Sequence, residues 1–382
     1  MTQAIKLALL LTLAGVISAC SLFSDDETEQ PRELTDINEQ FELERVWSVN
    51  VGDGQGEGYN RLAPAIDGQN IYAASADGTV MAINKETGRV LWRERTDLPI
   101  TGGVGAASGL VLVGTLDARV VAFNQSSGEQ MWTTAATSEV LAAPQTDGLR
   151  VVVQTIDGRL IGYDARDGER LWIYENTVPA LSLRGTSKPL ITGNRVIAGF
   201  ANGLIAAVDI TNGNLLWEER VAIPQGRYDI ERIIDIDGNP TLFGGIVYVS
   251  SFQGNLMGLD VQTGRIVWGM AGSSYNALAL GLGNIYWVDA NSHVFAVQNN
   301  SERTVWENDD LRLRKVNSPV TFNNYLAVGD FEGYLHVLSQ IDGQIVARTR
   351  IDRSGIRGEI ISEGRNLYVF TNSGRLSALR LP

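Results

Sequence analysis

A hairpin pattern that recurs about every 40 residues limits the possible folds of this chain more than any other feature. Its first copy covers residues 76–93 (ADGTVMAINKETGRVLWR). The dipeptide Asp77-Gly78 predicts a tight turn, because glycine tolerates the positive φ that such turns require. A strand from Val80 to Asn84, a second turn over residues 85–88 and a strand ending on Trp92 complete the hairpin.

Six further copies keep the same internal spacing. They cover residues 116–132, 156–172, 201–217, 252–268, 290–306 and 331–347. In each copy the second turn position lies ten residues after the first. Four residues later comes a position that is usually tryptophan, which we call the Trp slot. Two positions depart from the pattern, because Glu302 replaces the glycine of a second turn and Ala347 occupies the last Trp slot. Successive Trp slots are 40, 40, 45, 51, 38 and 41 residues apart, so regular units are joined by loops of variable length.

Another pair of strands is expected before each hairpin, for example within residues 63–74 and 239–250. Four strands per unit at a period near 40 residues are typical of a β-propeller blade. Apolar runs such as LIAAVDI (residues 204–210) break strict alternation, which suits blades buried on both faces. The sequence therefore predicts an all-β fold, a propeller of four-stranded antiparallel blades.

The eighth unit is split between the two ends of the chain. Residues 356–380 supply strands and turns, and the chain then stops where a fourth strand belongs. Residues 41–49 (FELERVWSV) form an isolated strand with Trp47 in the context of the Trp slot. We predict an eight-bladed β-propeller over residues 41–382 whose ring is closed by this N-terminal strand, which removes an exposed sheet edge. Seven of the eight tryptophans then occupy equivalent positions, and Trp287 is the exception.

Residues 1–19 predict a lipoprotein signal peptide. Lys6 precedes an apolar run over residues 7–16 that is too short to span a membrane. The following ISAC resembles the lipobox of bacterial lipoproteins, and its Cys20 is the only cysteine in the chain. We expect lipidation of Cys20 and, because Ser21 follows it, an outer-membrane destination with the ring facing the periplasm. The alternative is an ordinary secretion signal in which Cys20 is incidental.

Residues 20–40 are acidic and polar, and they predict a lipidated, flexible tether between the anchor and the ring. The whole chain has a formal net charge of −13, which argues against a nucleic-acid partner.

Two segments between repeats are atypical for propeller loops. Leu181 and Leu183 lie two residues apart beside Arg184, so an extended backbone would direct both leucines to the same side. The longest insertion places Asp235 and Asp237 two residues apart. Because both segments flank the fourth unit, an apolar pair, a guanidinium and two carboxylates can form a protein-docking patch. The alternatives are leucines tucked under the loop and solvated or turn-forming aspartates.

No arrangement typical of catalysis or metal binding is evident. His293 and His336 are the only histidines, and both fall in predicted strands, where a structural role is favoured. We find no nucleophile with a base, no paired cysteines and no metal-ligand spacing. The sequence therefore indicates a binding or scaffolding protein without a catalytic, metal or cofactor site.

The pattern Ala-x-Asx-x-x-Thr/Asn-Gly-x-x-x-Trp, clearest over residues 82–92 and 207–217, is similar to the repeats of pyrroloquinoline quinone (PQQ) dehydrogenases. In that family the Trp docks each blade onto its neighbour. The family's adjacent cysteines are missing, since Cys20 is alone, so the resemblance covers the scaffold and not the cofactor site.

The signal, the acidic tether, the eight units and the segment PALSLRG (residues 179–185) resemble the BamB family, lipoproteins of the outer-membrane β-barrel assembly (BAM) machinery. This resemblance covers essentially the whole chain. It implies contacts to the POTRA domains of BamA from five residues, namely Leu181, Leu183, Arg184, Asp235 and Asp237.

The same resemblance implies a non-catalytic, outer-membrane-anchored periplasmic scaffold that assists the folding and insertion of outer-membrane β-barrel proteins. Separately, exposed blade edges could pair with strands of unfolded precursors of these proteins. Two other functions stay open at this point. One is a PQQ-dependent, quinoprotein-like oxidoreductase, and the other is a ligand-binding propeller for cell-wall fragments, which clustered aromatic residues on one rim would favour.

Overall fold

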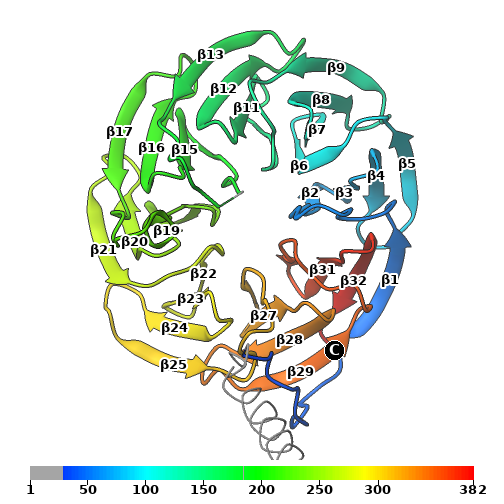
Figure 1. Cartoon of the computed structure of the whole chain (residues 1–382). Helices are drawn as coiled ribbons and strands as arrows, with labels where there is room; N and C mark the ends of the chain where they lie inside the picture. Colours follow the sequence, from blue (N-terminus) through cyan, green and yellow to red (C-terminus); the bar gives the residue numbers. More distant parts are fainter. Residues whose placement is uncertain (1–28, 184) are drawn as a thin grey trace, which may run out of the picture.

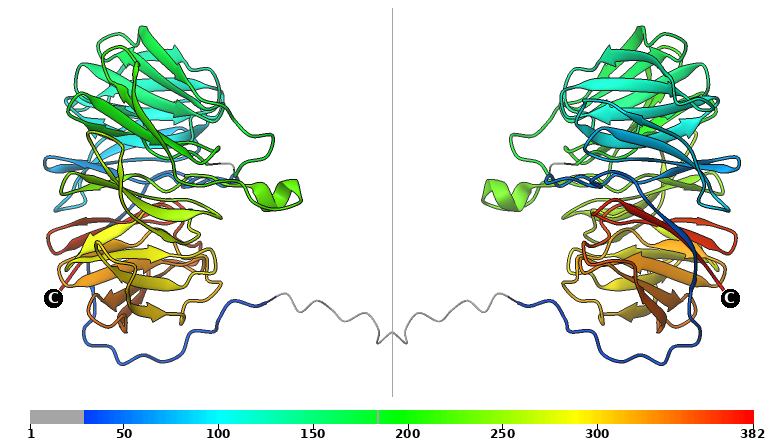
Figure 2. Two further views of the ribbon diagram at one scale, coloured as in Figure 1. Left: turned by 90° about the vertical axis from the view of Figure 1, so that its left-hand side faces the viewer. Right: turned by 90° about the vertical axis from the view of Figure 1, so that its right-hand side faces the viewer.

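Eight four-stranded antiparallel sheets surround a central axis in the computed structural model of this chain (Figure 1), which describes residues 29–183 and 185–382. The predicted eight-bladed propeller is therefore confirmed. Seen from the side, the blades stack around the ring and the loops extend from its two faces (Figure 2).

Each of the first four blades is one continuous stretch of chain, with the first strand innermost. Blade 1 contains β2 (Ala65–Asp67), β3 (Asn70–Ala74), β4 (Thr79–Asn84) and β5 (Val90–Arg95). Blade 2 contains β6 (Ile100–Ala107), β7 (Leu110–Thr115), β8 (Arg119–Asn124) and β9 (Gln130–Ala135). Blade 3 contains β10 (Gln145–Thr146), β11 (Arg150–Thr155), β12 (Arg159–Asp164) and β13 (Arg170–Glu175). Blade 4 contains β14 (Leu190–Thr192), β15 (Arg195–Gly199), β16 (Leu204–Asp209) and β17 (Leu215–Arg220).

The next three blades repeat this order, and the eighth combines both ends of the chain. Blade 5 contains β18 (Thr241–Phe243), β19 (Ile246–Ser250), β20 (Asn255–Asp260) and β21 (Ile266–Ala271). Blade 6 contains β22 (Ala279–Gly281), β23 (Asn284–Val288), β24 (Val294–Gln298) and β25 (Thr304–Asn308). Blade 7 contains β26 (Val320–Phe322), β27 (Tyr325–Gly329), β28 (Tyr334–Ser339) and β29 (Ile345–Arg350). Blade 8 contains β30 (Ile361–Glu363), β31 (Asn366–Phe370), β32 (Arg375–Arg380) and β1 (Glu44–Asn50).

The ring closes by pairing β1 with β32. The two strands are antiparallel, and their register runs from Glu44 opposite Arg380 to Asn50 opposite Arg375. The predicted closure by the N-terminal strand is therefore confirmed. It gives the last blade its fourth strand and covers the edge that β32 would otherwise expose.

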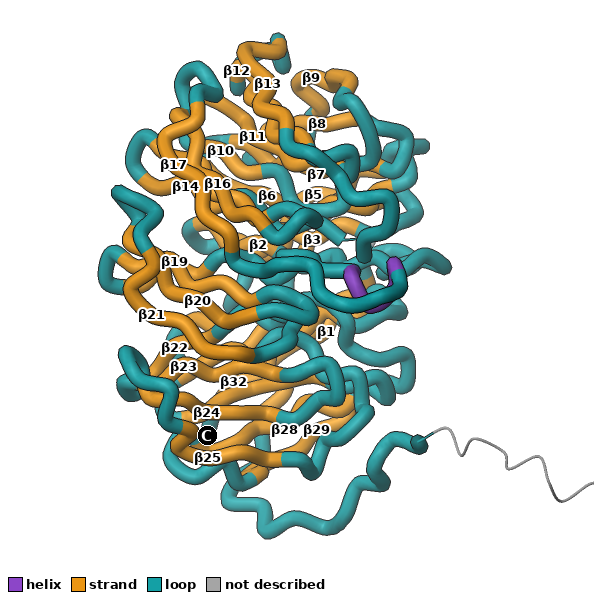
Figure 3. Tube along the Cα trace, turned by 60° about the vertical axis from the view of Figure 1, so that its left-hand side comes forward, coloured by secondary structure: helices purple, strands orange, loops and turns teal. Residues whose placement is uncertain are grey.

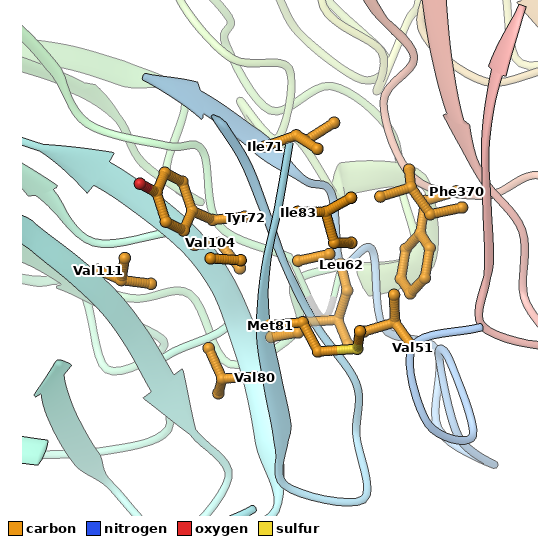
Figure 4. Close-up of a cluster of buried hydrophobic side chains, with 14 of the residues drawn as sticks. Val51, Leu62, Ile71, Tyr72, Val80, Met81, Ile83, Val104, Val111 and Phe370 are labelled. Carbon is orange, nitrogen blue, oxygen red and sulfur yellow. The ribbon is translucent and has the colours of Figure 1, made fainter. Parts of the chain in front are cut away.

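The core lies between blades as well as within them, because the middle strands of each blade are buried on both faces. One cluster joins Ile71 and Met81 of blade 1 to Val111 of blade 2 and Phe370 of blade 8 (Figure 4). Val51, which follows β1, packs into the same cluster. This double burial explains the broken alternation of the sequence, since neither face of these strands meets water.

Seven tryptophans join neighbouring blades in the same way. Each indole lies within a blade's outer strand and donates its N–H to a backbone carbonyl oxygen in a turn of the next blade, at 2.8 to 3.2 Å. The donor and acceptor pairs are Trp47–Lys85, Trp92–Gln125, Trp132–Ala165, Trp172–Ile210, Trp217–Val261, Trp268–Ser301 and Trp306–Gln340. The recurring Trp slot is therefore a blade-to-blade contact, as the family resemblance implied.

The glycine of each second turn makes room for this tryptophan. In blade 3, Gly168 has a φ of +74°, and a Cβ built on it would lie 2.7 Å from the ring of Trp132. Only glycine fits such a position without strain. Blade 6 has Glu302 there instead, and its turn places Asn300 in the left-handed region (φ 64°) while Trp268 donates to Ser301.

Ala347 stands in the Trp slot of blade 7 for a reason that the topology supplies. The next blade is blade 8, whose last two strands, β32 and β1, come from opposite ends of the chain, so no turn joins them. An indole at position 347 would have no turn carbonyl to receive its N–H. Ala347 is instead buried with Leu43, Leu379 and Leu381, which flank the junction of the two chain ends.

Residues 29–40, which we call the N-terminal strap, lie against blades 6 and 7. Leu34 and Ile37 pack on a core cluster there. Arg314 donates to the carbonyl oxygen of Arg32 at 3.0 Å, and Arg348 to that of Thr35 at 2.8 Å. The sequence predicts a flexible tether over residues 20–40, whereas its described part is held by apolar contacts and arginine side chains; residues 20–28 lie outside the described residues.

Within residues 29–183 and 185–382, no helix is both long and apolar enough to cross a membrane.

Candidate functional site

Two loops that flank blade 4 extend from the same face of the ring. The first loop (residues 176–189) connects β13 to β14, and the second loop (residues 221–240) connects β17 to β18. The second loop contains the short helix η1 (Asp229–Arg232), whose four residues are all exposed. Figure 3 shows this helix in purple within the second loop, and Figure 2 shows it projecting from the face of the ring to which the first loop also extends. The fold thus brings together the two segments that the sequence singled out.

Asp235 lies beneath the first loop. Its side chain is 2% exposed, and one carboxyl oxygen accepts a hydrogen bond from the backbone N–H of Leu183. Its backbone carbonyl oxygen accepts the N–H of Phe252 at 2.8 Å, which fixes the second loop to blade 5. Of the three sequence-based interpretations, a solvated carboxylate and a surface contact require an exposed side chain, whereas a turn-forming aspartate does not. The structure shows that Asp235 instead supports the backbone of the first loop.

Asp237 lies directly against Gly185 of the first loop. A Cβ built on Gly185 would be 2.5 Å from the Oδ1 atom of Asp237, so any larger residue would displace the carboxyl group. The glycine at position 185 therefore has a steric explanation. Because Asp235 and Asp237 both touch the first loop, the loops meet as one surface.

The two carboxyl groups titrate abnormally. Burial raises the pKa of Asp235 to about 9, and the neighbouring charge of Asp237 adds to the rise. Burial also raises the pKa of Asp237 to about 6, although the positive charge of Arg61 opposes this rise. In the described part of the chain, one oxygen of each carboxyl group has no hydrogen-bond partner. A protonated Asp235 avoids placing two negative charges side by side in a buried position.

The leucines of the first loop have different surroundings. Leu181 is 50% exposed, so half of its side chain is accessible to a partner. Leu183 is half-buried and borders the central cavity of the ring. The two leucines thus differ in exposure, and their predicted contacts to a partner stay a prediction. The third predicted contact of this loop, Arg184, lies outside the described residues.

Further exposed apolar side chains occur on the same two loops. Ile223, Tyr228 and Ile230 of the second loop are 63 to 70% exposed, and Val178 of the first loop is 40% exposed. The sequence analysis missed them because it considered the second loop for its aspartates alone. They were visible in the sequence as apolar residues within the two loops, and exposed apolar residues that gather together are typical of contact surfaces.

The two histidines take part in structure. His336 is fully buried, and its Nε2 lies 3.1 Å from the Oδ2 atom of Asp330, while Arg348 donates to its Nδ1 at 3.3 Å. Burial lowers the pKa of His336. His293 lies 3.3 Å from Asp289, four residues before it. Among the described residues, no group of three or more His, Cys, Asp or Glu side chains is placed to hold a metal ion.

This fold defines the chain as a β-propeller built from repeats of the PQQ-dehydrogenase type. The quinohemoprotein alcohol dehydrogenase from Comamonas testosteroni superimposes with a TM-score of 0.70 over 88% of this chain and 76% of that chain. At 13% sequence identity this likeness shows the fold alone.

More specific relatives identify the family. A family model described as outer membrane protein assembly factor BamB matches residues 42–101 and 76–308. The factor of this name from Pseudomonas aeruginosa is 57% identical over 98% of both chains, and that from Kangiella koreensis is 42% identical over 98% of this chain and 96% of its own. The crystal structure of BamB from Moraxella catarrhalis superimposes with a TM-score of 0.81 at 29% identity, over 89% of this chain and all of that one. The chain therefore belongs to the BamB family.

Proposed function

We propose that this protein is a non-catalytic scaffold of the BAM complex, which binds the POTRA domains of BamA and assists the folding and insertion of outer-membrane β-barrel proteins. Family membership supports the role in outer-membrane protein assembly, since its relatives are named for it. In this proposal Cys20 is lipidated and holds the ring at the outer membrane, facing the periplasm. The quinoprotein alternative is supported only by a likeness of fold.

The junction of the two loops is the observation that supports this docking site most strongly. Leu181 presents its side chain to solvent, while Asp235 holds the adjoining backbone from below through the N–H of Leu183. Asp237 fills the space beside Gly185. In this arrangement Leu181, Leu183 and Arg184 make the contacts to BamA, and the two aspartates fix the loop that presents them.

The energetic contribution of Leu181 follows from its exposure. Burying a leucine side chain completely is worth about 1.5–3 kcal/mol. Leu181 is 50% exposed before binding, so covering the rest contributes about 1 kcal/mol, or roughly five-fold in the dissociation constant. Binding should therefore weaken measurably, without being abolished, when this single side chain is shortened.

The test compares two leucine substitutions in the lipidated protein. Leu181→Ala should weaken the binding of purified BamA POTRA domains about five-fold. Leu149→Ala is the matched control, because Leu149 is 68% exposed in the turn between β10 and β11, away from both loops. Equal affinities for Leu181→Ala and Leu149→Ala would exclude this docking site. If the lipidated wild-type protein does not bind the POTRA domains, BamA is excluded as the partner.

Contact with unfolded precursors is a separate part of the proposal. The outermost strands of the blades, such as β5 and β13, have largely exposed side chains and a free backbone edge. An extended precursor segment could add to such an edge as a further strand. Slower amide exchange of an unfolded barrel precursor in the presence of the ring would support this role, and unchanged exchange would exclude it.

A further inference from the structure

The central cavity of the ring has a volume of about 840 Å³ and is bordered mainly by the loops that lead from one blade to the next around the ring. This volume falls within the range of about 300–1,000 Å³ that is typical of small-molecule sites. Its mouth lies beside the two loops, because Leu183, Gly185 and Asp237 border it. The N-terminal strap reaches the same mouth with Glu29 and Pro31.

The lining of this cavity is positive, although the chain has a net charge of −13. Four cationic side chains border it, namely Arg61, Lys188, Lys315 and Arg357, together with the carboxyl groups of Glu29, Asp237 and Glu359. Two of these carboxylates are already paired, because Glu29 lies 2.7 Å from Arg312 and Glu359 lies 3.7 Å from Lys188. This leaves three cationic side chains, those of Arg61, Lys315 and Arg357, with the one carboxyl group of Asp237. A cavity with an excess of positive charge attracts anions.

Two of these cations are held together on aromatic rings. The guanidinium carbon of Arg357 lies 4.6 Å from the ring centroid of Tyr59, and that of Arg61 lies 5.7 Å from the same centroid. Arg61 also lies 5.1 Å from the ring of Tyr275. Cation–π contacts of this kind fix guanidinium groups without neutralising them.

Both guanidinium groups retain hydrogen-bonding capacity. Arg61 donates to the carbonyl oxygen of Tyr275 at 3.2 Å, and Arg357 donates to that of Gly58 at 2.9 Å. In the described part of the chain, neither has a carboxylate within ion-pair distance. Each guanidinium has five N–H groups, so most donors remain for a ligand. Two like charges that share one ring repel each other, and an anion between them would relieve this repulsion.

The remaining lining decides what kind of anion fits. Val104, Leu141, Leu183, Leu313 and Ile361 contribute apolar side chains. A guanidinium fork matches a carboxylate or a phosphate, but an apolar wall favours a ligand that also has a hydrocarbon part. From this combination we infer that the central cavity binds an organic carboxylate whose charged end lies against Arg61 and Arg357 and whose apolar part lies along these five residues. This inference does not depend on the identity of the docking partner.

N-acetylleucine is a suitable probe, because it combines one carboxylate with an aliphatic side chain. Its binding to the full-length protein should be detected by ligand-observed NMR, and N-acetylleucinamide, which lacks the charge, should bind at least about ten-fold more weakly. Inorganic phosphate, which lacks the apolar part, should not displace the probe at equal concentration. Raising the salt concentration should weaken the binding of the acid and not that of the amide.

Two substitutions test the assigned residues. Arg61→Gln and Arg357→Gln should each weaken the binding of N-acetylleucine about ten-fold, because each removes charged hydrogen-bond donors. Arg265→Gln is the matched control, since Arg265 is exposed in the outer turn of blade 5. Equal binding of acid and amide, or unchanged binding in both variants, would overturn the inference. Displacement by phosphate would show a site for simple anions and would overturn the organic part of the assignment.

Discussion

Replacing Asp235 by Asn should change how the stability of the protein depends on pH. Asp235 is buried, and its pKa is raised to about 9, whereas an aspartate in an unfolded chain has a pKa of about 3.9. Between these values the folded protein retains a proton that the unfolded chain has lost. The free energy of unfolding of the wild type therefore falls as the pH rises, by about 1.4 kcal/mol per pH unit from this group.

Asparagine is similar in shape and cannot ionise, so the Asp235→Asn variant lacks this slope. Between pH 6 and pH 8 the variant should gain about 3 kcal/mol relative to the wild type. Reversible urea denaturation at pH 6, 7 and 8, followed by tryptophan fluorescence, measures this difference directly. The signal is well suited, because seven indoles lie between blades.

Asp342→Asn provides the control, because Asp342 is exposed in the outer turn of blade 7. Its stability difference from the wild type should be constant between pH 6 and pH 8. A constant difference for Asp235→Asn as well would show that the buried carboxyl group is charged in the folded protein. The contact between Asp235 and the first loop would then have to be explained with a charged carboxylate.

Two further predictions concern packing. Gly168→Ala should lower the free energy of unfolding by about 3 kcal/mol, because the residue has a φ of +74° and its new Cβ would lie 2.7 Å from Trp132. Gly193→Ala is the control: its φ is +57° but its Cβ would meet open space, so the free energy of unfolding should fall by only about 1–2 kcal/mol. Equal losses in urea denaturation would argue against the tryptophan contact. Asp330→Ala should cost about 3–5 kcal/mol, because it removes a buried partner of Arg314, and it should speed hydrogen exchange in the N-terminal strap. Unchanged exchange in the strap would show that this ion pair does not hold it.

The fold could be predicted from the sequence because its signals are local and repeated. The glycine of the second turn and the tryptophan of the outer strand recur together for a physical reason, since the left-handed turn at Gly168 must leave space for Trp132 of the preceding blade. The isolated strand around Trp47 indicated the closure, because the last unit lacked a strand. The reason for Ala347 became clear only from the topology, which leaves no turn for it to contact.

The candidate site was less accessible to sequence reasoning. The spacing of Asp235 and Asp237 is compatible with exposed or buried carboxyl groups, and only the position of the first loop above them decides between these possibilities. Burial by a distant segment is a property of the tertiary structure. The cluster of Arg61 and Arg357 on Tyr59 escaped notice for the same reason, because its members are almost 300 residues apart in the sequence.

The N-terminal strap also has a mechanical consequence. A force that pulls on the N-terminus reaches the strap before it reaches β1, the strand that closes the ring. The contacts of Arg314 and Arg348 with the strap backbone would break first, and they would dissipate the load along the side of blade 7. A pull on the strap from its N-terminal side should therefore load these two contacts before it loads the pairing of β1 with β32.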